Sequence, residues 1–196
     1  MNNKTRICLM IIIFIVLMGS CRTAEFGFKV VDISGMVYDF SNRPVAHFEV
    51  VLDRKFSRKY KGSTDINGRF TLFKVPVGIY TLIGSKKGYE HYFDELNIKQ
   101  KGQIIYIRIP SQNQLLNMVD EALVANDFTL AEETAERAFR IDNNNIEMLF
   151  YCATVAFRQN QFDKAISFLE KAKALGSKDF YVEKFLTSLK EIQHEN

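Results

Sequence analysis

Hydrophobic and polar residues alternate along the first half of the chain, in short runs separated by turn residues. Runs rich in Val, Ile, Phe and Tyr predict seven β-strands. They span residues 28–38, 47–52, 58–63, 69–73, 78–85, 92–98 and 103–109. Residues 42–44, 65–68 and Gly88 mark turns, because Pro presets φ and Gly tolerates positive φ. Short strands at this spacing predict a seven-stranded antiparallel β-sandwich, which we place at residues 28–110.

Beyond Pro110 the apolar residues recur at helical spacing, and two stretches align with each other at a constant offset. The aligned pairs are Leu115 with Leu149, Ala122 with Ala156, Asn126 with Asn160, Phe128 with Phe162, Ala131 with Ala165 and Ala138 with Ala172. A fixed period of 34 residues predicts stacked helix pairs, in which alanines permit close contact between helices. We expect about five helices in residues 111–196: two repeats, at 112–145 and 146–179, and a capping helix with Phe185, Leu189 and Ile192 on one face.

Several segments of the β half occur in the order found in a known family. They are Gly35-Met36-Val37-Tyr38-Asp39, Arg43-Pro44-Val45, Thr64-Asp65-Ile66-Asn67-Gly68-Arg69-Phe70, Val75-Pro76-Val77-Gly78-Ile79-Tyr80 and Lys87-Gly88-Tyr89. Residues 31–109 thereby resemble the carboxypeptidase-regulatory-like, transthyretin-like β-sandwich family. The resemblance implies a non-catalytic accessory domain that binds, spaces or stabilises. One departure is His47-Phe48, where a Gly-Ala pair is common, and it affects the expectation for that local turn.

The period of the helical half resembles that of the tetratricopeptide (TPR) family, with Leu115 and Leu149 at its Trp position and Asn143 and Ser177 at its Pro position. In that family the first helix of each repeat lines a groove that holds a peptide. The corresponding positions here are Leu116, Asp120, Leu123, Phe150, Thr154, Phe157 and Arg158. The Lys and Asn of the family's carboxylate clamp are absent, so binding of chaperone tails is not implied. The apolar members predict either a groove for a hydrophobic segment of a partner or a face packed on the β domain or a dimer mate.

The first residues have the order of a secretory signal. Lys4 and Arg6 precede an uncharged run at 7–17, which is shorter than the ~20 residues of a spanning helix. The segment Leu17-Met18-Gly19-Ser20-Cys21 resembles a bacterial lipobox, with Met18 where Leu is usual. The resemblance implies a signal peptide at 1–20, a lipid on Cys21 and a linker at 21–27; a plain signal peptide with an incidental cysteine is the alternative. Arg22, where an Asp would resemble an inner-membrane retention signal, favours the outer membrane in a cell that has two membranes.

Composition and motif content exclude several classes of function. Hydrophobic residues make up 47% of the chain, enough for packed cores. After cleavage and lipidation Cys152 would be the remaining free thiol, so we expect no intramolecular disulfide. His47 and His91 have no partner at metal-ligand spacing, and Asp65, Asn67 and Gly68 lack the further ligands of a calcium loop. No catalytic motif occurs, so we expect no enzyme activity, no cofactor and no metal site.

Charge is divided between the two halves. Residues 26–110 carry 14 Lys and Arg against 8 Asp and Glu, a net of +6, whereas residues 111–196 carry 9 against 14, a net of −5. The basic residues concentrate in a strip: Arg54, Lys55, Arg58, Lys59 and Lys61. This basic strip predicts either a surface for an anionic membrane or polyanion, or an edge hairpin kept soluble by its cations. A linker of some six residues reaches about 20 Å, which would keep the sandwich near the membrane.

Together these features predict a lipid-anchored, non-catalytic adaptor or scaffold of the bacterial cell envelope. Its partners would be envelope proteins and, through the lipid, the membrane; we expect no nucleic acid. The alternative is a module that binds a polyanion or glycan through the basic strip.

Overall fold

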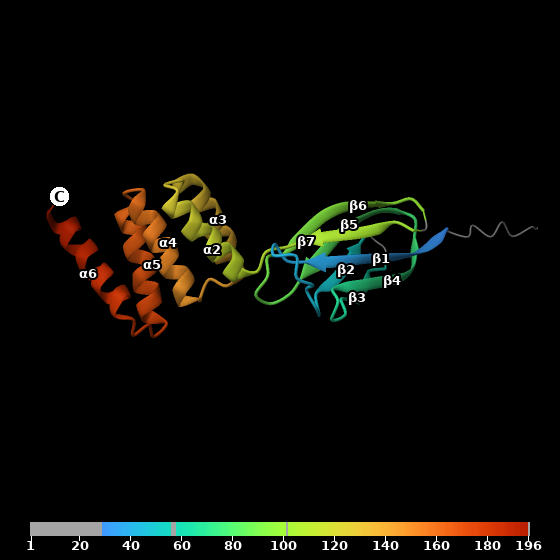
Figure 1. The fold of residues 1–196 in the computed structure, drawn as a ribbon, viewed down its shortest axis with the longest axis horizontal. Coiled ribbons are helices and arrows are strands. Elements are labelled where there is room, and N and C mark those ends of the chain that lie inside the picture. Colours follow the sequence, from blue (N-terminus) through green and yellow to red (C-terminus); the bar gives the residue numbers. More distant parts are fainter. Residues whose placement is uncertain (1–28, 56–57, 101, 196) are drawn as a thin grey trace, which may run out of the picture.

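The computed structural model describes residues 29–55, 58–100 and 102–195, and these form a β domain followed by a helical domain (Figure 1). The strands are β1 (Val30–Tyr38), β2 (Glu49–Asp53), β3 (Tyr60–Ser63), β4 (Arg69–Pro76), β5 (Gly78–Ser85), β6 (Tyr92–Ile98) and β7 (Ile104–Arg108). The helices are α2 (Gln112–Val124), α3 (Phe128–Ile141), α4 (Ile146–Arg158), α5 (Phe162–Ala174) and α6 (Phe180–Glu195). The predicted signal peptide, Cys21 and the linker lie outside the described residues.

The strands form two facing sheets, one of order β4-β1-β7 and one of order β3-β2-β5-β6. Alternation places one side of each strand in a shared core. In β1, for example, Val31, Ile33 and Val37 are buried, while Asp32 and Ser34 are exposed. The predicted strand positions are confirmed to within a few residues, and the two sheets pack as a sandwich-like domain.

The expectation of a purely antiparallel sandwich is wrong, because β1 and β7 pair in parallel. Strand β6 belongs to the four-stranded sheet, and β7 belongs to the other sheet. The chain therefore crosses between sheets near Gly102, which has φ 87°. The crossing brings the chain to the end of the sandwich at which β1 begins. Strand β7 therefore runs along the free edge of β1 in the same direction.

The segment around His47 is tied to the turn before β4. His47 has a positive φ of 54°, and the following Phe48 is fully buried. The buried hydroxyl of Thr64 donates to the carbonyl of Val45 at 2.6 Å and accepts from the backbone N–H of Phe48 at 2.8 Å. The residue pair that departs from the expected Gly-Ala thus places an aromatic ring in the core without loss of backbone hydrogen bonds.

Helices α2, α4 and α6 begin at residues 112, 146 and 180, so the interval between successive starts is the same. Side chains cap the first two of these helices: Ser111 forms a capping box with Gln114, and Asn145 accepts from the N–H of Met148. Asn126 and Asn160, which are equivalent positions of the two repeats, follow α2 and α4 with φ of 57° and 61°. Asn tolerates this left-handed conformation, which explains why the pair recurs.

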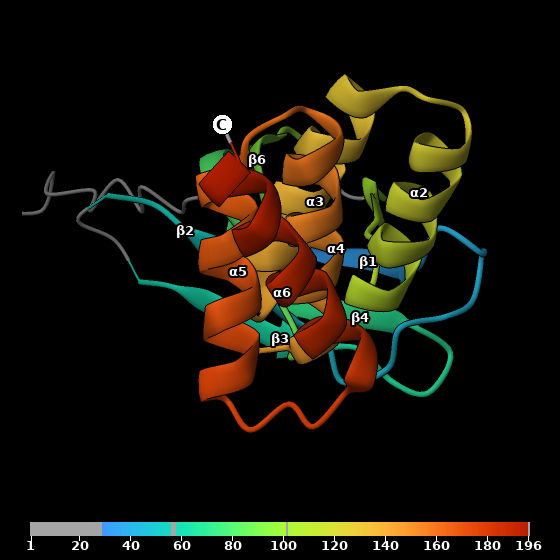
Figure 2. The ribbon, with the colours of Figure 1, turned by 90° about the vertical axis from the view of Figure 1, so that its left-hand side faces the viewer.

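The helices stack with small residues between them, and Figure 2 shows α6 at the outer end of the stack. Leu149 and Ala153 of α4 pack with Ala165 and Leu169 of α5. Phe139 and Phe168 contact both this cluster and the cluster of α2, α3 and α4, so the helical core is continuous. No helix in the described part of the chain is long and apolar enough to cross a membrane.

Candidate functional site

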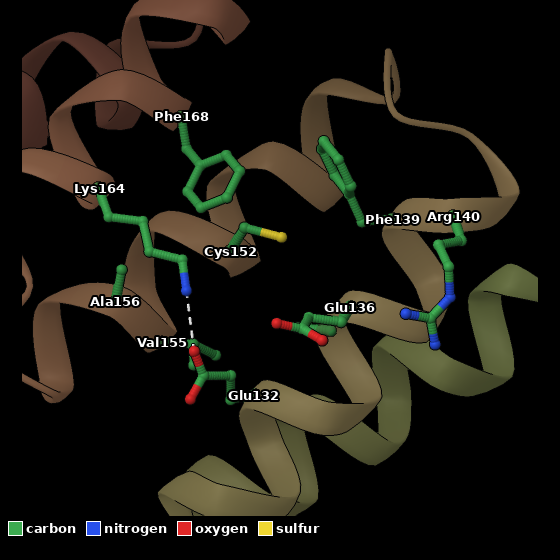
Figure 3. Close-up of a pocket in the computed structure, with 10 residues that line it drawn as sticks. Glu132, Glu136, Phe139, Arg140, Cys152, Val155, Ala156, Lys164 and Phe168 are labelled. Atoms are coloured by element: carbon green, nitrogen blue, oxygen red, sulfur yellow. Dashed lines mark hydrogen bonds and ion pairs between the residues drawn. The ribbon is translucent and has the colours of Figure 1, made fainter.

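A pocket of about 280 Å³ opens between α3, α4 and α5 (Figure 3). Its floor is apolar and its rim is charged. The lining residues are Glu132, Ala135, Glu136, Phe139, Arg140, Cys152, Val155, Ala156, Lys164 and Phe168. We call this space the helical pocket.

The helical pocket exists because small residues lie between two aromatic rings and a charged edge. Ala135 and Ala156 are both buried, and neither side chain is long enough to fill the space above it. Phe139 and Phe168 meet edge to face, with ring centroids 5.7 Å apart, and close one side. Lys171 lies over the Phe139 ring at 5.2 Å, which adds a cation–π contact outside the pocket. The cavity therefore has firm walls that suit an apolar side chain.

The rim carries both signs of charge. Lys164 pairs with Glu132 at 2.8 Å, and Gln159 donates to the other carboxylate oxygen of Glu132 at 2.9 Å. The hydrogen bond from Lys164 lowers the pKa of Glu132, so this carboxylate is charged at neutral pH. Glu136 and Arg140 are exposed on the α3 side of the opening. A bound segment would meet an apolar floor and partners for either charge at the edge.

Cys152 contributes the sulfur at the floor of the helical pocket (Figure 3). Its thiol is free, and the residue is only 5% exposed. Burial raises the pKa of this thiol to about 12, so it is a neutral, weakly polar group rather than a nucleophile. It acts here as a small core residue, the role that the helical pattern predicted.

The seven predicted groove positions do not form one open surface. Leu116 is buried and Leu123 half-buried in the core of α2, α3 and α4. Phe150 and Phe157 contact Phe185 of α6, with ring centroids 5.9 Å and 5.4 Å apart. Within the chain, the helix that contacts these two rings is α6 rather than an element of the β domain.

The polar groove positions are scattered. Asp120 is exposed on α2, and Thr154 donates to the carbonyl of Phe150 in its own helix. Arg158 donates to Asn126 at 2.8 Å and lies over the Phe128 ring at 5.1 Å. Arg158 thus links the ends of α2 and α4 and does not face an open groove.

The basic strip lies on and around the β2–β3 hairpin, at the edge of the four-stranded sheet. All five of its side chains are exposed: Arg54, Lys55, Arg58, Lys59 and Lys61. Lys59 pairs with Asp53 at 2.7 Å, and the Arg54 guanidinium lies over the Tyr80 ring at 5.9 Å. Both sequence expectations remain open, because an edge hairpin and an anion-binding surface each need exposed cations.

Two hollows flank the junction between the domains, with volumes of about 530 and 570 Å³. His91 and Ile141 line both hollows, and His47 lines the one that also contains Lys86 and Lys87. Between the domains, Arg137 of α3 forms a bidentate pair with Glu90, at 2.7 and 2.8 Å. Backbone hydrogen bonds between residues 88–90 and 110–112, and one from the Gln114 side chain to Ser41, add to this ion pair. The junction is therefore held by polar contacts and a short linker.

Among the residues that the structure describes, no group of three or more His, Cys, Asp or Glu could hold a metal ion. The carboxylate of Asp65, a member of the calcium-like sequence, accepts from the backbone N–H groups of Asn67 and Arg69, each at 2.9 Å. Gly68 takes φ 72° in the same turn. These contacts show that the Asp65 carboxylate stabilises a backbone turn.

Sequence reasoning did not find the helical pocket. The alignment of the two repeats compares equivalent positions, but Phe139 and Phe168 are not equivalent: they align with Lys173 and Thr134. The available signal was that the second helix of each repeat carries, besides the phenylalanine at its start, one further ring among buried alanines. Only the approach of α3 to α5 shows that the two rings meet.

Three solved structures illustrate what the chain is similar to. The TIE protein of Bacillus anthracis has 15% identity and a TM-score of 0.38, over 42% of this chain and 16% of that one. A type II cohesin–X-dockerin complex of Acetivibrio cellulolyticus has 17% identity and a TM-score of 0.37, over 43% and 60%. Catechol 1,2-dioxygenase of Acinetobacter sp. ADP1 has 9% identity and a TM-score of 0.36, over 45% and 55%. The chain spans less than two thirds of each, and likeness at this level carries no functional inference.

No curated protein matches the chain. Residues 32–104 match the family of the carboxypeptidase regulatory-like domain. The match spans the sandwich from β1 to the start of β7, and this domain is non-catalytic by family. The chain thus contains a carboxypeptidase regulatory-like domain at residues 32–104, followed by a helical C-terminal region.

Proposed function

We propose that this protein is a lipid-anchored, non-catalytic adaptor of the bacterial cell envelope. The sandwich would space a TPR-like helical domain from the membrane, and the helical domain would bind partner proteins. The observation that carries the proposal is the constant interval between the starts of α2, α4 and α6, at residues 112, 146 and 180. Helix pairs that repeat at this interval form scaffolds for protein–protein contact.

The repeat extends to packing as well as to spacing. Ala131 and Ala138 of α3 are fully buried, as are Ala165 and Ala172, their equivalents on α5. On α6, the buried residues Val182, Leu186 and Leu189 are the equivalents of Met148, Cys152 and Val155 of α4. Since those α4 residues pack in the cluster that contains α3, α6 packs on α5 as the first helix of a third repeat would.

The other face of α6 ends the stack. Leu149, Ala153 and Ala156 of α4 pack on α5, but the equivalent positions of α6 are Glu183, Thr187 and Lys190. All three are exposed. A polar outer face is what a terminal helix of a repeat array needs to stay soluble. This supports α6 as the cap of a short TPR-like array.

In this proposal the helical pocket is the partner site. Its apolar floor would accept one large apolar side chain, and its rim would pair with charged neighbours of that side chain. The open groove predicted along Phe150 and Phe157 is a less favourable site, because Phe185 of α6 contacts both rings. The partner would thus be an envelope protein with an exposed apolar anchor residue.

Photocrosslinking in intact cells tests the site. A photoreactive amino acid replaces Glu136, an exposed residue of the pocket rim, and in a second strain it replaces Glu133. Both are exposed glutamates of α3, but Glu133 does not line the pocket. We expect a discrete protein adduct from position 136 that is weak or absent from position 133. The same adducts from both positions, or none from either, would contradict the assignment of the pocket.

The anchor rests on the lipobox-like segment that ends at Cys21. Cys8 provides a matched control, because it lies upstream in the apolar run. In cells fed a clickable palmitate analogue, the protein should incorporate label. Cys21→Ala should abolish incorporation and Cys8→Ala should not. Label that persists in Cys21→Ala would show that the lipid is attached elsewhere. Membrane fractionation would then test our placement in the outer membrane where a cell has two.

A further inference from the structure

One end of the sandwich lies farthest from the helices, at the right of Figure 1. Pairing of Val30 with Pro76 places the start of β1 beside the end of β4, and pairing of Gly78 with Ile98 places the start of β5 beside the end of β6. The β4–β5 turn joins the two sheets there, and the backbone N–H of Val77 donates to the carbonyl of Lys29. We call this end the distal pole: the start of β1, the β4–β5 turn and the end of β6.

The distal pole is strongly basic. Lys29, Lys74 and Lys99 are exposed on it. The β2–β3 hairpin lies beside it, because Arg54 contacts Tyr80, whose hydroxyl donates to the carbonyl of Pro76 at 2.8 Å. The hairpin adds four exposed cations: Arg54, Lys55, Arg58 and Lys59. Among the acidic residues nearby, Asp53 pairs with Lys59 and Asp32 accepts from the backbone N–H of Lys74. Glu95, which lies opposite Thr81 on β6, is exposed, so cations outnumber acidic residues at this end.

Large apolar side chains project among these cations. Phe73 is 68% exposed, Ile79 54% and Val30 51%. Phe73 and Ile79 flank the β4–β5 turn on opposite outer faces of the sandwich, since they belong to different sheets. Surfaces that insert into the interface of a lipid bilayer combine exposed apolar side chains with lysines in this way. The turn between Phe73 and Ile79 is held to the core by Val77.

We propose that the distal pole is a membrane-binding surface, with Phe73 and Ile79 in the headgroup region of a bilayer that contains anionic lipid and the surrounding cations over the headgroups. The proposal rests on the anchored adaptor proposed above and deepens it. The described residues begin at Lys29 on this pole, a short distance along the chain from the predicted lipid site at Cys21. The anchor would deliver the chain to this end of the sandwich.

Two physical arguments assign the pole to the membrane. Each Lys or Arg near an anionic surface strengthens partitioning by about fivefold, and this attraction fades beyond about 8 Å at physiological salt. Only cations at the pole itself would contribute. Two contacts, the lipid and the pole, would fix the angle between the long axis of the protein and the bilayer and direct the helical pocket outward. A lipid alone would leave the sandwich free to rotate.

The chain contains no Trp, so one introduced Trp reports its own surroundings. The full-length lipidated Phe73→Trp variant is reconstituted in phosphatidylglycerol-rich vesicles that contain lipids brominated on the acyl chain. We expect a blue-shifted Trp emission and loss of most of it to bromine quenching. Phe180→Trp is the matched control, because Phe180 is 67% exposed on α6, far from the pole. It should show neither change.

A charge-reversal pair tests the cations. Lys55→Glu with Lys99→Glu, in the Phe73→Trp protein, should lower the ratio of inserted to free pole by at least about 25-fold, two cations at about fivefold each. Lys178→Glu with Lys184→Glu at the helical end should leave quenching unchanged. Protein that floats with vesicles while Phe73→Trp stays unquenched would overturn the membrane-binding pole but not the anchor. Protein that does not float would overturn both the anchor and the membrane-binding pole. Unquenched Trp together with salt-sensitive binding of heparin would assign the cations to a soluble polyanion and also overturn the proposal.

Discussion

At the scale of single residues, two parts of the family-like sequence meet in space. Gly35 pairs with Phe70 across β1 and β4, and the Phe70 ring lies where a Cβ on Gly35 would be. The same Cβ would also lie 2.7 Å from the carbonyl oxygen of Ile105 in β7. The glycine of the first motif is therefore required by the phenylalanine of the Thr-Asp-x-Asn-Gly-x-Phe segment.

This contact predicts the effect of Gly35→Ala. The new methyl group would displace either the buried Phe70 ring or the β7 backbone, at a cost of about 1–3 kcal/mol in the free energy of unfolding. Ser34→Ala, at the next and exposed position of β1, should change it by less than about 0.5 kcal/mol. Denaturant unfolding followed by circular dichroism measures both. Equal effects of the two substitutions would show that the close approach at Gly35 carries no cost.

Cys152 yields a chemical prediction. Since burial raises its pKa to about 12, only about one thiol in ten thousand is ionised at pH 8. Native protein should react with iodoacetamide far more slowly than the same protein in denaturant, where the thiol titrates normally. Mass spectrometry of the peptide that contains Cys152 measures the rate. Equally fast labelling in native and denatured protein would mean that the helical pocket admits the reagent and ionises the thiol.

At the scale of elements, α6 stabilises the helical domain by covering two rings that would otherwise be exposed. Phe185 contacts both Phe150 and Phe157. Phe185→Ala should therefore lower the free energy of unfolding of the helical domain by about 3 kcal/mol. Phe180→Ala in the same helix removes a ring that is 67% exposed and should cost less than about 0.5 kcal/mol. Urea unfolding followed by far-ultraviolet circular dichroism, which is dominated by helices, separates the two.

The elements also show what the sequence can and cannot predict. Alternation along β1 and the pairing of equivalent residues in the two repeats depend on local chemistry, so strands and helices were predicted near their observed bounds. The parallel pairing of β7 was missed, because it depends on which sheet the chain crosses into after β6. The covering of Phe150 by Phe185 was missed because both positions are apolar, and apolarity alone does not name a partner.

At the scale of the whole molecule, the two domains have separate cores. The buried cluster of the sandwich ends at Ile109, and those of the helical domain begin at Leu115. The sandwich is basic and the helical half acidic, but the ion pair between them runs the other way, with Glu90 from the basic half and Arg137 from the acidic half. The ion pair at the junction therefore depends on where these two side chains lie, and it does not follow from the net charges of the two domains.

The last prediction concerns how that junction depends on pH. The hydrogen bond from Arg137 holds the pKa of Glu90 below its usual 4.5. A carboxylate with a lowered pKa contributes stabilisation that is fully present above the ordinary pKa and is lost as pH falls through the lowered one. Glu90→Gln should remove about 1 kcal/mol of this stabilisation at pH 6, a modest value because both side chains are partly exposed.

Hydrogen exchange at Gln112 reports the junction directly, because its backbone N–H donates to the carbonyl of Gly88 at 2.9 Å. At pH 6 this amide should exchange about fivefold faster in Glu90→Gln than in the unmodified protein, in proportion to the lost stabilisation. The difference should persist at pH 4.5 and disappear in stronger acid, where both proteins lack the charge. Glu95→Gln, an exposed change on β6, should not alter exchange at any pH. If Glu90→Gln leaves the rate at pH 6 unchanged, the ion pair does not hold the domains together, and the backbone contacts of residues 88–112 alone set their arrangement.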